Sequence, residues 1–207
     1  MQPFTKLSAI AAPFDRINVD TDQIIPARYL RKSRRHPDYA TYLFRDLRFN
    51  NDGTEKPDFV LNQPAYRQAK ILVADVNFGC GSSREGAVFA LAAYGIRSVI
   101  AASFGDIHYN NCFKNGLLPI RLDENILVTL RAQLFEQPGS TIEIDLEGQF
   151  IIGPDGTKHT FDIDAFRKRC LLEGLDDIGL TLMHEETMAA FETRYQETYN
   201  WMTPEKG

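Results

Sequence analysis

A small-residue turn between an apolar run and a helical pattern constrains this chain more than any other segment. Residues 71–76 (ILVADV) have the length and β-branched content of a buried strand, and the turn at 77–85 reads NFGCGSSRE. The Ala- and Leu-rich run 85–94 that follows stops at Gly95, a residue typical of helix ends. The sequence therefore predicts a strand, a tight loop and a helix in that order.

The composition of this loop suits an anion. Gly79 and Gly81 permit positive φ angles and close approach of backbone amides to a ligand, and the helix start offers unpaired N–H groups with a partial positive charge. Ser82, Ser83 and Arg84 stand at the same entrance, which suits binding of a carboxylate or phosphate and proton transfer through an oxygen. A structural alternative stays open, in which one of the serines only caps the helix.

The overall composition narrows the class of protein. The chain has 207 residues, of which 43% are hydrophobic and 25% charged, as in a globular domain of ordinary size. Its formal net charge of -5 argues against a nucleic-acid partner, because such partners require clustered Lys and Arg. It has no apolar run of about eighteen residues and no secretory stretch at the start, so we expect a cytoplasmic protein with no membrane span.

The cysteines of this chain do not suggest a metal or disulfide framework. Cys80, Cys112 and Cys170 are odd in number, widely separated and without the spacing of zinc or iron–sulfur ligands. We therefore expect this chain to hold no metal. Cys80, beside a helix start, is a candidate nucleophile with His108 as its conceivable base, although a small buried thiol and a structural histidine are the favoured interpretations.

Two carboxylates near the N-terminus form a second candidate region. The segment 18–26 (NVDTDQIIP) places Asp20, Thr21 and Asp22 just before a short apolar pair. Asp22, followed by a first helical turn, is a candidate cap. Capping explains one carboxylate but not both, so Thr21 and Asp22 are also candidates for the active site.

A cluster of cationic residues follows this region. Residues 28–37 carry five Lys or Arg side chains, and Pro37 prevents one long helix. This segment is either a solvated face or a flap that brings a guanidinium to an anionic substrate. Aromatic and apolar residues at near-helical spacing over 39–49 predict core or interface anchors.

The remaining pattern predicts a mostly parallel sheet. Apolar strands at 96–104 and 117–120 alternate with a helix at 107–115, and ligands of such sheets bind beyond the carboxyl ends of the strands. The other expected elements are an amphipathic helix at 123–137, a β-hairpin from 141–147 and 158–163, and closing helices at 165–173 and 184–201.

Four segments together resemble one family, the bacterial small subunits of 3-isopropylmalate dehydratase (isopropylmalate isomerase). They are 18–26, 77–85, 95–115 and 174–182, the last of which reads GLDDIGLTL. The resemblance covers nearly the whole chain in the right order. The GSSRE loop is also similar to that of the mobile swivelling domain in aconitase-like enzymes, so membership of the aconitase superfamily is the broader expectation.

The resemblance implies a fold and an activity. The fold is one three-layer α/β swivelling domain over 1–207, with a mostly parallel sheet, flanking helices, an additional β-hairpin, a substrate-discriminating flap at about 28–37 and a C-terminal helical extension at about 184–201. The activity is a hydro-lyase reaction of leucine biosynthesis that isomerises 2-isopropylmalate and 3-isopropylmalate by dehydration and rehydration.

The resemblance also implies a partner and leaves alternatives. Members act only in a heterodimer with a large subunit, whose 4Fe-4S cluster serves as Lewis acid toward a small dicarboxylate substrate. The alternatives are a homoaconitase or citramalate isomerase small subunit, a self-sufficient hydrolase or transferase that uses Cys80, and a non-catalytic anion-binding module.

The resemblance assigns roles to the loop residues. Ser82 is the base that removes the proton α to a carboxylate, acting as an alkoxide, which requires amide donors, Arg84 and exclusion of water to lower the pKa of its hydroxyl. Ser83 and Arg84 hold the substrate carboxylate, with Arg84 bidentate.

Further roles by resemblance fall outside the loop. Thr21 and Asp22 match positions near the active site. In the flap, Leu30 or its neighbours are expected to face the isopropyl group, and Lys32 or Arg35 to meet a carboxylate.

Overall fold

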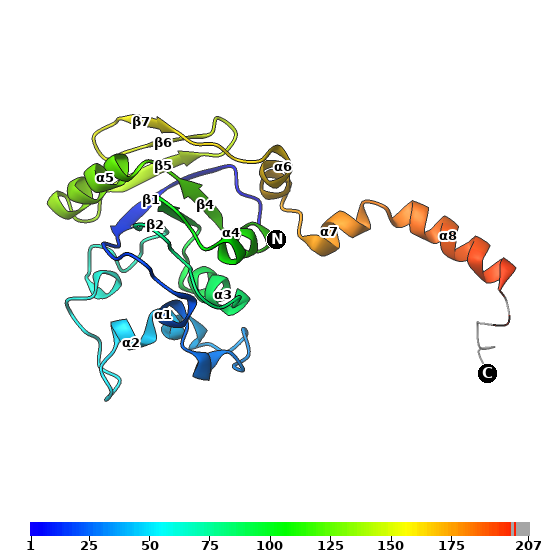
Figure 1. Ribbon diagram of the computed structural model, residues 1–207, viewed down its shortest axis with the longest axis horizontal. Coiled ribbons are helices and arrows are strands. Elements are labelled where there is room, and N and C mark those ends of the chain that lie inside the picture. The colour runs from blue at the N-terminus through cyan, green and yellow to red at the C-terminus, as the bar shows by residue number, and fades with distance from the viewer. Residues whose placement is uncertain (200, 202–207) are drawn as a thin grey trace.

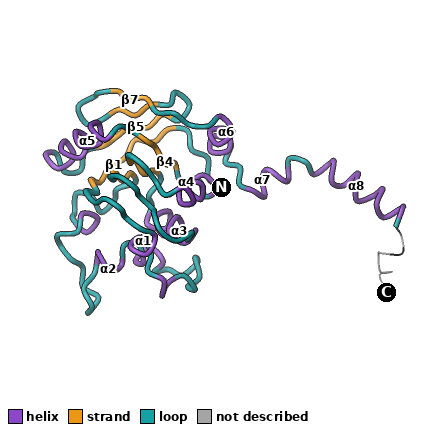
Figure 2. The backbone as a smooth tube through the Cα atoms, viewed as in Figure 1, coloured by secondary structure: helices purple, strands orange, loops and turns teal. Residues whose placement is uncertain are grey.

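A seven-stranded mixed sheet forms the centre of the molecule (Figures 1 and 2). The computed structural model describes residues 1–199 and 201. The strand order is β4-β3-β2-β1-β5-β6-β7. The pairs β1–β2, β2–β3 and β3–β4 are parallel. The pairs β1–β5, β5–β6 and β6–β7 are antiparallel. The strands are β1 (Lys6–Pro13), β2 (Ile71–Val73), β3 (Ser98–Ala101), β4 (Leu118–Arg121), β5 (Thr141–Asp145), β6 (Phe150–Ile152) and β7 (Lys158–Thr160).

Helices flank this sheet and extend the chain beyond it (Figure 1). The α-helices of the described chain are α1 (Thr21–Ile24), α2 (Arg45–Arg48), α3 (Glu85–Tyr94), α4 (Asp106–Lys114), α5 (Glu124–Glu136), α6 (Ala165–Glu173), α7 (Asp177–Leu182) and α8 (Glu185–Thr198). Three short 3-10 helices also occur among the same residues, η1 (Ala27–Tyr29), η2 (Tyr39–Tyr42) and η3 (Val60–Asn62). In the described chain no helix is both long enough and apolar enough to cross a membrane.

Neighbouring residues of the parallel strands enter two different cores. Leu72 joins the core that contains Leu91 of α3, whereas Ile71 joins the core that contains Leu130 of α5. All four side chains are fully or almost fully buried. Because successive side chains of a strand point to opposite faces, the two cores lie on the two sides of the sheet. The predicted α/β architecture, with a mostly parallel sheet between helices, is confirmed.

Local patterns predicted several elements well. The helix expected over 85–94 is α3, and Gly95 ends it with a φ of +108°. The strands expected at 71–76, 96–104 and 117–120 are present as β2, β3 and β4 but are shorter than, or slightly shifted from, the apolar runs. For the first two, the residues after the carboxyl end leave the sheet and form the loops of the candidate site.

The prediction of one β-hairpin from 141–147 and 158–163 is wrong. β5 pairs with β6, and β6 pairs with β7, so the region is a three-stranded antiparallel meander. β6 has only three residues, too few for an alternating pattern to be recognised. The turn before it depends on Gln149 at a φ of +53° and on a 2.7 Å hydrogen bond from the Gly148 N–H to the Asp145 carboxylate.

Two further segments contain short helices. The residues at near-helical spacing over 39–49 form η2 and α2, which are separated by Phe44 in the left-handed region, with a φ of +49°. The prediction that these residues include core anchors is confirmed, since Tyr39, Tyr42 and Phe44 are buried. The segment 174–182, expected only as a connection, contains α7.

The C-terminal helices α7 and α8 extend away from the rest of the molecule (Figure 1). The helix expected over 184–201 is α8, which spans Glu185–Thr198, and residue 200 of that prediction lies outside the described residues. At the base of these helices, the N-terminal ammonium of Met1 donates to the Gly174 carbonyl at 2.9 Å and pairs with the Asp176 carboxylate at 3.2 Å. We refer to residues 177–199 as the C-terminal arm.

Candidate active site

The loop after β2 is fixed on one side by the segment that follows β1. The Gly79 N–H donates to the Val19 carbonyl at 2.7 Å, and the Thr21 N–H donates to the Cys80 carbonyl at 2.9 Å. Asp20 and Cys80 form an isolated parallel bridge. The two regions singled out from the sequence, about 60 residues apart, therefore lie side by side at the carboxyl edge of the sheet.

The loop after β3 fixes the other side. The Phe78 N–H donates to the Ser103 carbonyl at 3.0 Å, and the Gly105 N–H donates back to the Phe78 carbonyl at 2.9 Å. The Asn77 N–H donates to the Ser103 hydroxyl at 2.9 Å. Three segments that follow neighbouring parallel strands thus converge, as expected for a ligand site of a parallel sheet.

Close packing under the loop requires glycine at two positions. Gly79 has a φ of +73°, and a Cβ there would lie 2.2 Å from Cγ of His108. A Cβ on Gly105 would lie 2.5 Å from the Gly79 carbonyl oxygen. Neither position accommodates a larger residue without displacement of the loop.

Ser82 and Ser83 are both exposed at the entrance to α3. The N-cap of α3 is Arg84, and no side chain of the described residues forms a capping hydrogen bond there. Within the described chain, neither serine hydroxyl takes part in a hydrogen bond. The alternative in which these serines only cap the helix is therefore wrong, and their hydroxyls are available to a ligand at the helix N-terminus.

The Asp20–Asp22 segment contributes to this entrance in a way that sequence reasoning only partly anticipated. Asp20, not Asp22, caps α1, because its carboxylate accepts the Gln23 N–H at 2.7 Å. Thr21 is 1% exposed, and its hydroxyl donates to the Ser82 carbonyl at 2.9 Å. The prediction that Asp22 acts as the cap is wrong.

Asp22 instead forms an ion pair with Arg84. A guanidinium nitrogen of Arg84 donates to a carboxylate oxygen of Asp22, and the Arg84 side chain is 19% exposed. This pair fixes the cation beside the exposed serines while leaving part of it open to solvent. An anionic ligand would find at one place a guanidinium, two hydroxyls and the amide groups of a helix start.

The flap segment 28–37 lies over α3. A Cβ built on Gly86, in the first turn of α3, would be 2.9 Å from Cδ2 of Leu30. The guanidinium carbon of Arg34 is 3.0 Å from the ring centroid of Phe89. Leu30 is therefore beside the helix start that carries the site, and it is 39% exposed.

Lys32 and Arg35, the other predicted flap residues, are exposed. Among the described residues, the side chain of neither forms a hydrogen bond or ion pair. The structure therefore brings Leu30 to the first turn of α3, whereas Lys32 and Arg35 have no comparable contact there among the described residues.

The environment of Cys80 does not favour a nucleophilic thiolate. Burial and the nearby charge of Asp20 raise the pKa of the Cys80 thiol. His108 is 2% exposed, and neither of its ring nitrogens has a hydrogen-bond partner among the described residues. Burial lowers the pKa of His108 to about 4, so the imidazole is neutral and packs edge-on against Phe78 at 5.6 Å. This geometry argues against a Cys80–His108 catalytic pair and supports the structural interpretation of His108.

Sequence reasoning missed Arg131, which stabilises the strand end before the loop. Arg131 is 6% exposed and donates to the Ala74 carbonyl and the Asp75 carboxylate, each at 2.7 Å. It occurs four residues after Leu127, on the apolar face of α5, and a lone arginine on such a face was the available signal. The interaction anchors α5 to the chain immediately before the loop.

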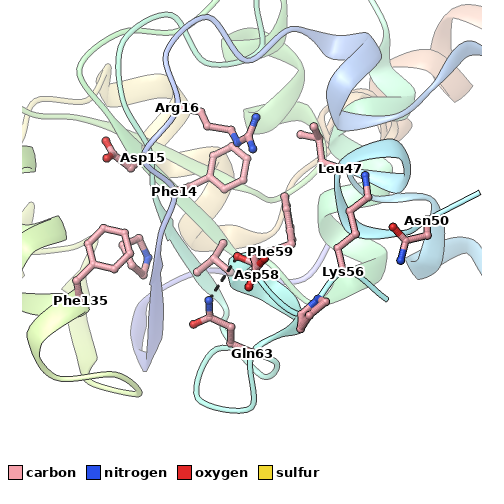
Figure 3. Close-up of a pocket in the computed structure, with 13 residues that line it drawn as sticks. Phe14, Asp15, Arg16, Leu47, Asn50, Lys56, Asp58, Phe59, Gln63 and Phe135 are labelled. Carbon is pink, nitrogen blue, oxygen red and sulfur yellow. Dashed lines mark hydrogen bonds between the residues drawn. The ribbon is translucent and has the colours of Figure 1, made fainter. Parts of the chain in front are cut away.

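A separate cavity lies beside the end of β1 and is not part of this site. Its volume is about 520 Å³, and Figure 3 shows Arg16, Lys56, Asp58, Phe59 and Phe135 among the residues around it. None of the predicted site residues lines it. The loop at the start of α3 is the better candidate, because it combines the exposed hydroxyls with a fixed cation.

Family models match most of the chain. Residues 1–125 match the aconitase C-terminal domain, and residues 128–165 match a model described as LeuD_N. Residues 177–205 match the C-terminal domain of the 3-isopropylmalate dehydratase small subunit.

Relatives of known name match over their full length. The 3-isopropylmalate dehydratase small subunit of Paramagnetospirillum magneticum is 52% identical over 98% of this chain and 100% of that protein. The one of Nitrobacter hamburgensis is 53% identical over 97% of this chain and 100% of that protein. The crystal structure of 3-isopropylmalate dehydratase (leuD) from Methanocaldococcus jannaschii aligns with a TM-score of 0.66 at 28% identity, covering 89% of this chain and 98% of that one. The chain belongs to the family of 3-isopropylmalate dehydratase small subunits within the aconitase superfamily.

Proposed function

We propose that this chain is the small subunit of a two-subunit 3-isopropylmalate dehydratase that acts in the cytoplasm. It takes part in the interconversion of 2-isopropylmalate and 3-isopropylmalate by dehydration and rehydration, a step of leucine biosynthesis. The full-length similarity to named small subunits supports this function. The observation that carries it is the exposed pair Ser82 and Ser83 at the start of α3, beside an Arg84 that Asp22 orients.

The substrate is a dicarboxylate, and the loop has the groups to bind one carboxylate. Arg84 offers a planar guanidinium suited to bidentate binding, and Ser83 offers a hydroxyl at the same entrance. The unpaired amides and the positive end of the α3 dipole add to this attraction. Thr21 supports the site from beneath, since its hydroxyl holds the Ser82 carbonyl at 2.9 Å.

Ser82 is the proposed base that removes the proton α to a carboxylate. A free serine hydroxyl is too weak an acid for this role, so its alkoxide must be stabilised by the helix start, by Arg84 and by exclusion of water. Ser82 is exposed in this chain, so water is not excluded until another surface covers the loop. This requirement supports a chain that is inert alone and active only when its loop is covered by the large subunit.

The 4Fe-4S cluster is proposed to belong to the large subunit. Among the described residues, no group of three or more His, Cys, Asp or Glu side chains is arranged to hold a metal ion. The cysteines of this chain therefore do not fit the cluster as ligands. When bound in the partner, the cluster supplies the Lewis acid for loss of the substrate hydroxyl.

The flap is proposed to distinguish substrates by their side group. Leu30, partly exposed over the first turn of α3, provides an apolar surface for the isopropyl group. Lys32 and Arg35 are proposed to approach a carboxylate when the flap closes over the substrate. Homoaconitase and citramalate isomerase small subunits are the alternative functions, and they differ in the side group to be accommodated.

The test is turnover of 3-isopropylmalate under anaerobic conditions with this chain, an iron–sulfur large subunit, and their mixture. Activity is expected only in the mixture. Ser82→Ala is expected to reduce that activity by at least about 100-fold, because it removes a positioned base, while subunit association and thermal stability are retained. Cys80→Ala is the matched control and is expected to leave turnover intact. A fully active Ser82→Ala enzyme would refute the role of this serine. A mixture that turns over citramalate or homoaconitate but not 3-isopropylmalate would favour the alternative functions.

A further inference from the structure

The C-terminal arm presents an apolar surface that the described residues do not cover. Every residue from 181 to 199 is exposed, and no residue of α7 or α8 is buried in the described chain. Half of the fourteen large hydrophobic side chains exposed in the described residues belong to the arm. They include Ile178, Leu182, Met188, Phe191, Tyr195 and Tyr199.

Apolar side chains of α8 and of its C-cap residue form one stripe. Met188, Phe191 and Tyr195 of α8 and the C-cap Tyr199 are spaced by three or four residues, the spacing of one side of a helix. Their rings follow one another, with centroids 5.7 Å apart for Phe191–Tyr195 and 4.9 Å apart for Tyr195–Tyr199. α8 has 14 residues, and helices of about this length are marginal in water without packing of their apolar face. The stripe therefore requires a surface to bury it.

The arm is not directed toward its own sheet. Its base is held by Asp176, paired with the N-terminus of Met1, and by Asp177, paired with Lys114 at 3.0 Å. Beyond this anchor, α7 and α8 extend outward and away from the strands (Figure 1). The anchored base and extended helices are the arrangement of a segment that reaches another protein.

The charges of α8 indicate which kind of surface would bind it. The helix contains four glutamates and one arginine, a net charge of -3. Glu185 and Glu192 lie three or four residues from Met188, which places both carboxylates beside the stripe. Two copies pairing through their stripes would bring these carboxylates close together, which disfavours a second copy of this chain. A partner with a basic rim around an apolar groove would complement both the stripe and the carboxylates beside it.

We propose that the arm docks in such a groove on the large subunit and holds the two subunits together away from the active site. This inference rests on the proposed function, which supplies that partner. The arm coincides with the segment shared with the C-terminal domain of dehydratase small subunits, proteins that by name are one part of a larger enzyme. Docking through a remote arm leaves the loop at α3 free to accept substrate before the two proteins close around it.

The test compares two glutamate substitutions in the full chain. Phe191→Glu places a charge in the stripe, and Ala190→Glu places the same charge on the other side of α8. The dissociation constant for the purified iron–sulfur large subunit is measured by calorimetry. Phe191→Glu is expected to weaken binding at least about 10-fold, from loss of one buried aromatic side chain, and Ala190→Glu less than about 3-fold.

Each contrary result has a distinct meaning. If Phe191→Glu binds the large subunit as tightly as the unmodified chain, the docking role is wrong while the proposed function stands. If the unmodified chain does not bind the large subunit at all, both proposals fail. If the free chain is a dimer that Phe191→Glu dissociates, the stripe covers a second copy. If Phe191→Glu instead lowers the melting temperature of the free monomer, the arm packs on its own domain. Either of these last two results overturns docking on the large subunit.

Discussion

The active-site loop and the C-terminal arm present exposed side chains by opposite means. The loop has its serines at the surface, but its backbone is hydrogen-bonded to the segments that follow β1 and β3. The arm exposes Phe191 and its neighbours on α8, and ion pairs at Asp176 and Asp177 tie its base to the rest of the described chain. The first region is shaped within the chain, whereas the second depends on what covers it.

This difference determines whether a substitution changes the stability of the isolated chain or its association with a partner. Changes beneath the loop alter the free energy of unfolding of the isolated chain, because they disturb packing that the chain itself completes. Changes in the arm leave that quantity nearly constant and act on association. Substitutions beneath the loop are therefore expected to change stability most, and removal of the arm least.

Gly79→Ala is expected to have the largest effect. The new Cβ would lie 2.2 Å from His108 at a φ of +73°, so both steric overlap and backbone strain oppose it. We expect a loss of about 4 kcal/mol in the free energy of unfolding, measured by urea denaturation.

Gly156→Ala is the matched control for this substitution. Gly156 also has a positive φ, of +81°, but no atom of the described residues lies within 4 Å of the place that a Cβ would occupy. It is expected to lose only about 1 kcal/mol from backbone strain. Equal losses at the two positions would show that contact with His108 is unimportant to the loop.

His108 is expected to have an effect of intermediate size on the free energy of unfolding, and this effect depends on pH. Its pKa is about 4 in the folded chain because burial disfavours the charged imidazolium, and about 6.5 in the unfolded chain. Between these values the unfolded chain binds a proton that the folded chain does not. The free energy of unfolding should therefore fall by up to about 3 kcal/mol as the pH decreases from 6.5 to 4.

His108→Leu removes this contribution, because leucine has a similar volume and no titratable group. Since neither imidazole nitrogen has a partner among the described residues, the substitution is expected to be nearly neutral at about pH 8. Chemical denaturation of both proteins from about pH 8 to about pH 4 measures the difference in slope. Parallel curves for the two proteins would contradict a neutral, buried His108.

Removal of residues 184–207 is expected to have the smallest effect on stability. None of the described residues removed is buried, and the ion pairs of Asp176 and Asp177 at the arm base are retained. We expect a change of less than about 0.5 kcal/mol in the free energy of unfolding of the free chain. A drop of several degrees in its melting temperature would show that the arm packs on the domain and would remove the contrast with the loop.

Much of the fold was predictable from local sequence, because its signals are contained within one element. Apolar runs and the Gly95 stop predicted β2, the loop and α3, and the resemblance pointed to the GSSRE segment. The short β6 and the left-handed Phe44 were not predictable in this way. Three residues are too few to show a period, and a positive φ at a phenylalanine is imposed by surrounding packing.

The sequence by itself determined which chemical groups the site has: two serines and an arginine at a helix start, and carboxylates in an earlier turn. Only the tertiary structure decided their partners, since Asp20 and Asp22 look alike as capping residues in sequence. Asp20 caps α1, while Asp22 is paired with Arg84 across 62 positions of the chain. The physical reason is that capping and helix formation depend on nearby residues, whereas this ion pair exists only because neighbouring parallel strands bring their following loops to one edge of the sheet.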